Sequence, residues 1–151
     1  MPFVRPICLS ALLLPLAALA APPPGWTERH GVYVLPANEG GQLALVVYID
    51  RPTQRVTYGF RDLPQRMNCT PASYGRGPTL DIETKRIPFG KECVEGTFTY
   101  VPRNLPARKA FIAVLRQATV LHVRTASFFP LTFDLRGLGA VQRELQSMPR
   151  K

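Results

Sequence analysis

The sequence predicts an α+β protein, mainly an antiparallel β-sheet or sandwich, with two short helices in the C-terminal half and one disulfide. Three observations lead to this class. Short apolar or alternating segments are separated by turn residues over residues 31–101. Two amphipathic segments at helical spacing follow in the last third. A pair of cysteines remains once an N-terminal leader is set aside. Strands that precede helices in this way are typical of antiparallel α+β domains.

The strongest strand signal covers residues 42–50, which read QLALVVYID. These β-forming residues have few polar breaks and therefore predict a central strand. A shorter strand is expected over residues 31–35, ended by Pro36. Residues 51–54 read as a hairpin turn and residues 55–61 alternate, so the segments on either side of the turn should pair antiparallel.

A region rich in proline and glycine, residues 63–78, is predicted to be a loop. Alternation then predicts one strand over residues 80–87 and another over residues 93–101. Cys69 lies in the loop and Cys93 begins the second of these strands. A disulfide between them would tie the loop before one strand to the start of the next.

A helix is predicted to begin near Pro106, with Asn104 or Leu105 at its cap. Its apolar residues recur at spacings of three and four, and they are Ala107, Ala110, Phe111, Val114, Leu115 and Ala118. Strands are expected over residues 119–125 and 131–135, with a hairpin connection over 126–130. Gly137 then caps a final helix, whose apolar stripe is Leu138, Val141, Leu145 and Met148.

Residues 1–20 are predicted to form a secretory signal peptide. Arg5 gives a positive start, an uncharged apolar stretch follows, and Ala18 and Ala20 supply the small residues that a signal peptidase requires. The alternative is a membrane anchor, but a spanning helix needs about 20 apolar residues and Pro15 interrupts this run. We therefore expect cleavage near Ala20.

Cleavage would leave a proline-rich spacer over residues 21–26 and a single domain over residues 27–151. The mature chain of about 130 residues suits one domain with a hydrophobic core. Its location would be the periplasm or the extracellular space, with no transmembrane segment in the mature chain.

Cys69 and Cys93 are the two cysteines left after cleavage, and an even pair in an exported chain predicts a disulfide. A metal site would need more ligands, and the two histidines, His30 and His122, each stand alone. We therefore expect neither a metal nor another cofactor.

The charge is uneven along the chain. Residues 101–151 carry nine basic and two acidic residues, a net charge of +7, whereas residues 21–100 are close to neutral. A basic surface raises the local concentration of anionic partners, although it can also be only a solvated face. The candidate partner-binding residues are Arg108, Lys109, Arg116, Arg124, Phe128, Phe129, Arg136 and Arg143, with Arg103 as a further basic residue.

The sequence lacks a complete catalytic constellation. Its serines do not lie in the Gly-x-Ser-x-Gly turn of a hydrolase. Asp81 and Glu83 would share one face of the strand over residues 80–87, where a solubilising row is the simpler interpretation. His122 stands in mid-strand between apolar neighbours. The prediction is a protein that is not an enzyme.

Several short segments occur in a familiar order. They are Gly25-Trp26-Thr27, Leu80-Asp81-Ile82, Ile87-Pro88-Phe89 with Cys93 and Gly96, Val120-Leu121-His122-Val123, Pro130-Leu131-Thr132-Phe133 and Leu135-Arg136-Gly137-Leu138. In these segments the chain resembles the invasion-associated locus B family of small exported bacterial proteins, which are rich in β-structure and contain disulfides. The family's cysteine soon after the tryptophan is absent here. The resemblance implies an envelope location and a binding or structural role, with no catalytic residues to transfer.

Three functional hypotheses follow. The first is a noncatalytic exported domain that binds an envelope component or a protein partner through its basic C-terminal face. The alternative is a secreted enzyme inhibitor that uses the disulfide-tethered loop over residues 67–78. The third, a small hydrolase, would use Asp81, Glu83 or His122.

Overall fold

The structure is a computed structural model that describes residues 21–41, 43–63, 69–70, 72–125 and 128–149. The predicted signal peptide lies outside these residues. The strands are β1 (Thr27–Arg29), β2 (Val32–Pro36), β3 (Leu43–Asp50), β4 (Arg55–Asp62), β5 (Gly75–Ile82), β6 (Lys85–Val94), β7 (Thr97–Pro102), β8 (Val120–Thr125) and β9 (Phe128–Asp134), and the helices are α1 (Leu105–Gln117) and α2 (Leu138–Ser147).

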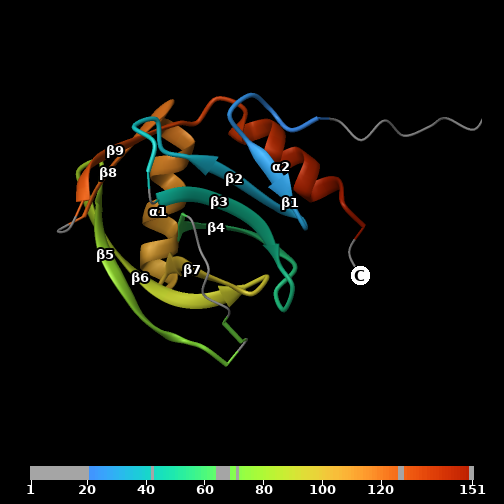
Figure 1. The fold of residues 1–151 in the computed structure, drawn as a ribbon, viewed down its shortest axis with the longest axis horizontal. Coiled ribbons are helices and arrows are strands. Elements are labelled where there is room, and N and C mark those ends of the chain that lie inside the picture. Colours follow the sequence, from blue (N-terminus) through green and yellow to red (C-terminus); the bar gives the residue numbers. More distant parts are fainter. Residues whose placement is uncertain (1–20, 42, 64–68, 71, 126–127, 150–151) are drawn as a thin grey trace, which may run out of the picture.

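All the strands belong to one antiparallel sheet in the order β1-β2-β3-β4-β7-β6-β5-β8-β9. The sheet is strongly curved, and α1 lies inside the curve (Figure 1). Helix α1 packs against β6 and β7, whereas α2 packs against β3 and β4. The predicted class, an antiparallel α+β fold with two helices in the C-terminal half, is confirmed.

Strand β3 is buried on both faces, as its continuous apolar run predicts. Leu45 and Val47 point into the main core, and Val46 and Tyr48 belong to a second, smaller cluster with Val32 and Val101. The hairpin between β3 and β4 is also confirmed, with Asp50 opposite Arg55.

The main core forms where α1 meets the sheet. Asn104 caps the helix, because its Oδ1 accepts a hydrogen bond from the Ala107 N–H at 2.9 Å. The buried side of the helix consists of Ala107, Phe111, Val114 and Leu115. Phe111 lies against Phe60 and Phe89, with ring centroids 5.4 and 5.5 Å away. One aromatic cluster thus joins α1 to β4 and β6.

Helix α2 begins after Gly137, which has a φ of 86°, a conformation that favours glycine. A Cβ on Gly137 would also lie 2.5 Å from the Cβ of Pro23. Trp26 is buried in the main core, and its indole N–H donates to the Arg136 carbonyl at 3.1 Å. The end of the predicted spacer is therefore attached to the start of α2.

Two of the predicted strands are wrong, because each covers a hairpin turn and parts of the two strands that the turn connects. Residues 80–87 are divided between β5 and β6 by a turn at Glu83, whose φ is 54°. Residues 93–101 are divided between β6 and β7 by a turn at Glu95 and Gly96. A hairpin turn of two residues shifts the buried positions by one, here from Leu80 and Ile82 to Ile87 and Phe89, and the prediction of one strand did not use this shift.

The predicted loop over residues 63–78 is too long, because β5 already begins at Gly75. The pairing of β5 with β6 shifts between Arg76 and Thr79, and this irregularity accommodates Pro78. A Cβ on Gly77 would lie 2.9 Å from the Phe89 carbonyl oxygen, so glycine permits the close approach of the two backbones. Strand β9 likewise begins at Phe128, inside the predicted hairpin connection.

The turn between β2 and β3 reaches across to β9, at the far end of the sheet. The Asn38 N–H donates to the Thr132 carbonyl at 2.8 Å, and the Thr132 N–H donates to Glu39 Oε2 at 2.8 Å. The Thr132 hydroxyl also donates to Glu39 Oε1. A carboxylate and a peptide group thus close the curve of the sheet around α1.

This closure predicts a pH dependence at Glu39. The hydrogen bonds from the Thr132 hydroxyl and backbone N–H hold the pKa of Glu39 below its usual value of 4.5. A lowered pKa stabilises the fold above about pH 4.5, and this contribution is lost as the pH falls through the folded-state pKa. Glu39→Gln should therefore lower the urea midpoint at pH 7 and have a smaller effect at pH 3. An equal effect at both values would contradict this assignment.

Candidate functional site

The structure places three of the predicted partner-binding cations on one helix. Arg108, Lys109 and Arg116 are exposed on α1. Lys109 and Arg116 lie on the side away from its buried residues, and Arg108 lies at the edge of the buried side, next to Leu115 in projection. Residues 108, 109 and 116 fall within a sector of about 100° around a helix of 3.6 residues per turn. We call these three residues the α1 cation row.

Helix α2 adds a fourth exposed cation, Arg143. The two helices are connected by Tyr58 of β4, whose hydroxyl accepts a hydrogen bond from the Gln142 amide at 2.9 Å. Arg116 lies close enough to Tyr58 for its charge to lower the pKa of that phenol, although burial raises it more strongly. The C-terminal end of the α1 cation row therefore adjoins α2.

Two other predicted cations lie beside carboxylates. The Arg136 guanidinium forms an ion pair with Asp134, with Nε 3.0 Å from Oδ1 and 2.8 Å from Oδ2. This pairing lowers the pKa of Asp134 and raises that of Arg136. Arg124 is exposed on β8 opposite Asp81 of β5. Arg136 is thus paired locally, and Arg124 shares Asp81 with Arg86. In the α1 cation row, only Arg108 lies near a carboxylate, that of Glu92.

The ion pairs among the described residues connect strands, turns and loops. They join Arg51 to Glu95, Arg86 to Asp81, His122 to Glu83 and Arg136 to Asp134. Within that part of the chain, no cation of α1 or α2 takes part in such a pair. Helix α1 also contains no acidic residue. Phe128 and Phe129 are at the start of β9, but their side chains lie outside the described residues.

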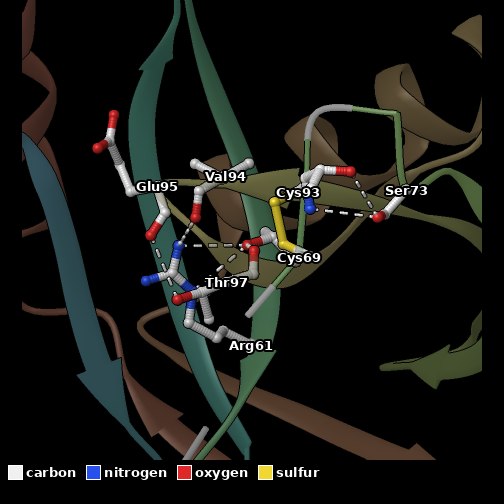
Figure 2. The surroundings of a disulfide bond; sticks show 9 residues. Arg61, Cys69, Ser73, Cys93, Val94, Glu95 and Thr97 are labelled. Atoms are coloured by element: carbon white, nitrogen blue, oxygen red, sulfur yellow. Dashed lines mark hydrogen bonds between the residues drawn. A yellow bond between two sulfur atoms is a disulfide. The ribbon is translucent and has the colours of Figure 1, made fainter. Parts of the chain in front are cut away.

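The predicted disulfide is present. Cys69 and Cys93 are bonded, their Cα atoms are 5.7 Å apart, and the Cys69 N–H donates to the Gly96 carbonyl at 3.2 Å. Figure 2 shows the bond beside Val94 and Arg61, whose guanidinium donates to the Val94 carbonyl at 3.2 Å. The bond ties the segment before β5 to the end of β6, not to the start of a strand as the sequence predicted.

In the disulfide-tethered segment, hydrogen bonds between Thr70 and Ser73 close a turn. The Ser73 N–H donates to the Thr70 carbonyl at 2.8 Å, and the Thr70 N–H donates to Ser73 Oγ at 3.2 Å. Tyr74 follows this turn with 73% of its surface exposed. Residues 67 and 68, the start of the predicted inhibitory loop, lie outside the described residues, and its last residues belong to β5.

The predicted carboxylate pair is not assembled. Glu83 lies in a turn. Its Oε1 accepts a hydrogen bond from the His122 backbone N–H at 2.8 Å and also lies 3.1 Å from His122 Nδ1. The backbone hydrogen bond is the main reason that the pKa of Glu83 is lowered. Asp81 instead lies 4.0 Å from Arg86 Nε. The prediction that Asp81 and Glu83 share a strand face is wrong, because Glu83 is not in a strand.

Sequence reasoning missed a groove at the N-terminal end of α1. Its volume is about 460 Å³, within the range of small-molecule sites. The groove lies between the first turns of the helix and the start of β6, and its lining residues are Lys85, Arg86, Ile87, Pro88, Asn104, Pro106, Ala107 and Ala110. Recognition of the turn at Glu83 would have been needed to place Lys85 and Arg86 beside the helix.

A second feature that the sequence did not reveal is a buried polar group beside β3. The Tyr48 hydroxyl is buried and has no hydrogen-bond partner among the described residues. Burial raises the pKa of Tyr48 and of Glu92, and it lowers that of Arg61, which donates to Thr99 Oγ1 at 3.3 Å. The Tyr48 phenol therefore stays neutral at physiological pH.

Comparison with known proteins gives no match to a protein family, to a curated protein or to a solved structure. Among the described residues, no helix combines the length and apolar character needed to cross a membrane. In the same part of the chain, no three histidine, cysteine or acidic side chains are grouped as metal ligands would be.

Proposed function

We propose that this chain is an exported, noncatalytic domain that binds an anionic component of the cell envelope through the α1 cation row. The predicted leader and the Cys69–Cys93 disulfide support an extracytoplasmic location, because disulfides persist in oxidising compartments. The resemblance to the invasion-associated locus B family points to the same compartment. The sequence analysis predicted binding through a basic C-terminal face, and the proposal assigns that binding to the α1 cation row.

The observation that carries the proposal is the contrast between α1 and the strands. Lys109 and Arg116 are exposed on a helix without an acidic residue, whereas Arg86 and Arg136 are paired with carboxylates. Arg108, on the same helix, lies near the Glu92 carboxylate of β6. Unbalanced charge gives a surface potential that attracts anions. Near an anionic membrane each cation contributes about 1 kcal/mol of binding free energy.

The test is cosedimentation of the exported, oxidised protein with vesicles. We expect binding to phosphatidylglycerol vesicles, little binding to phosphatidylcholine vesicles, and loss of binding in 0.5 M salt, where charges are strongly screened. Changing Arg108, Lys109 and Arg116 together to Glu should weaken binding at least 100-fold, from about 1 kcal/mol per lost cation.

A matched control separates the site from the net charge. Arg29, Arg55 and Arg76 are exposed cations away from α1, and changing all three to Glu alters the net charge equally. This variant should keep most of the binding. Equal losses in the two triple variants would contradict a binding site on α1.

The enzyme-inhibitor hypothesis keeps one supporting observation. Tyr74 is exposed beside a segment that the disulfide anchors, as an inserting side chain of an inhibitor would be. This hypothesis predicts capture of an envelope enzyme that survives 0.5 M salt and is lost in Tyr74→Ala. Capture that is lost in salt, or that Tyr74→Ala leaves intact, would favour the α1 cation row instead.

A further inference from the structure

We propose that the groove at the N-terminal end of α1 holds the alkyl chain of an anionic lipid, with the lipid's head group against Lys85 and Arg86. This inference rests on the proposed function and adds to the α1 cation row a second point of contact with an anionic lipid. The ligand class is a single alkyl chain with a phosphate or carboxylate head, either free or as one chain of a membrane lipid.

The floor of the groove is apolar. Ile87 and Ala107 are almost fully buried, and Pro88, Pro106 and Ala110 complete the apolar part of the lining. A volume of about 460 Å³ is enough for a small ligand. The hydrophobic effect favours an alkyl chain here, at about 0.8 kcal/mol for each buried methylene.

The lining offers few hydrogen-bonding groups, which argues against a peptide. Pro88 and Pro106 have no backbone N–H. The Pro88 carbonyl already accepts from the Arg103 N–H at 3.0 Å, and Asn104 Oδ1 accepts from the Ala107 N–H at 2.9 Å. A bound peptide would leave its own N–H and C=O groups without partners, whereas an alkyl chain needs none.

The mouth of the groove is cationic. Lys85 and Arg86 are both exposed; Arg86 forms a long ion pair with Asp81 at 4.0 Å, whereas Lys85 is in none of the ion pairs found among the described residues. The positive end of the α1 dipole also favours an anion here, and no acidic residue in the first turn offsets it. Arg108 and Lys109 do not line the groove, and by helical spacing they lie 100° or more around α1 from Ala110, so the groove and the α1 cation row are separate cationic surfaces.

The experiment uses nuclear magnetic resonance titrations of the exported, oxidised protein with three probes below their micelle-forming concentrations. The probes are decyl phosphate, decyl glucoside and inorganic phosphate. We expect decyl phosphate to bind at least tenfold more tightly than either other probe, with shifts at Ile87, Ala107 and Ala110. Equal binding of decyl glucoside, equal binding of inorganic phosphate, or shifts elsewhere would overturn the proposal.

Two substitutions at alanines of α1 provide the matched comparison. Ala110 lines the groove and Ala113 does not, although both are half-buried. Ala110→Leu should weaken decyl phosphate binding at least tenfold, and Ala113→Leu should leave it unchanged. An Ala110→Leu protein that keeps the wild-type affinity for decyl phosphate would overturn the proposal that the alkyl chain binds in the groove.

A charge variant tests the head-group contacts. Lys85→Gln with Arg86→Gln should lower the affinity for decyl phosphate to that for decyl glucoside, and an unchanged preference for the phosphate would overturn this part of the proposal. The two proposals can fail separately. If wild-type protein binds phosphatidylglycerol vesicles but not decyl phosphate, only the proposal of lipid binding in the groove fails. If it binds decyl phosphate but not the vesicles, the membrane-binding function fails.

Discussion

Replacing Phe60 with alanine is expected to lower the free energy of unfolding by about 4 kcal/mol. Phe60 is fully buried, and its ring centroid lies 5.6, 5.4 and 5.7 Å from those of Phe89, Phe111 and Phe133. Truncation removes buried apolar surface and three aromatic contacts, and it leaves a cavity between α1 and the sheet. Because small proteins have only about 5–15 kcal/mol of stability, this change removes a large part of it.

Urea unfolding of the oxidised protein measures this effect. The control is Phe98→Ala, the same substitution at a half-buried residue of β7 that lies beneath the Lys91 ammonium, 3.8 Å from it. We expect the control to lose less than half as much stability. Similar losses at Phe60 and Phe98 would show that the aromatic cluster is not the centre of the core.

Reduction of the disulfide is expected to lower the free energy of unfolding by about 3 kcal/mol. Cys69 and Cys93 are 24 residues apart in sequence, so the bond closes a loop of moderate length. In the loop-entropy account the bond acts mainly by restricting the unfolded chain. It also holds the Cys69 N–H at the Gly96 carbonyl, and this contact should loosen when the bond is broken.

The measurement is urea unfolding with and without a reductant, in the wild-type protein and in a variant with both cysteines changed to alanine. The double variant should resemble the reduced wild type and should not respond to the reductant. A wild-type protein whose urea midpoint is unaffected by the reductant would contradict the expected contribution of the bond.

The sequence predicts those elements whose local pattern agrees with their final environment. The apolar run of β3 indicates a strand buried on both faces, and the Asn104 cap followed by Pro106 marks the start of α1. Gly137 similarly marks the start of α2. The cysteine pair is predicted correctly because only two cysteines follow the predicted leader, which leaves few alternatives.

The turns at Glu83 and Glu95 could not be placed with the same reasoning. Tight hairpins are usually recognised from Asn-Gly or Asp-Gly, and Glu83-Thr84 offers neither residue. Gly96 was the available signal for the other turn. The misplaced turns also concealed the candidate groove, because its two basic residues, Lys85 and Arg86, approach α1 only when β6 begins directly after Glu83.

The contacts of Thr132 also bear on how this protein avoids self-association. The outermost strand of a sheet can recruit a strand from another molecule, which leads to fibres or aggregates. On β9 the outward N–H and C=O of Thr132 are already occupied by Glu39 and Asn38, and Pro130 has no N–H to offer. At the opposite end, β1 is only three residues long. The two end strands of this sheet thus give a second molecule little to extend.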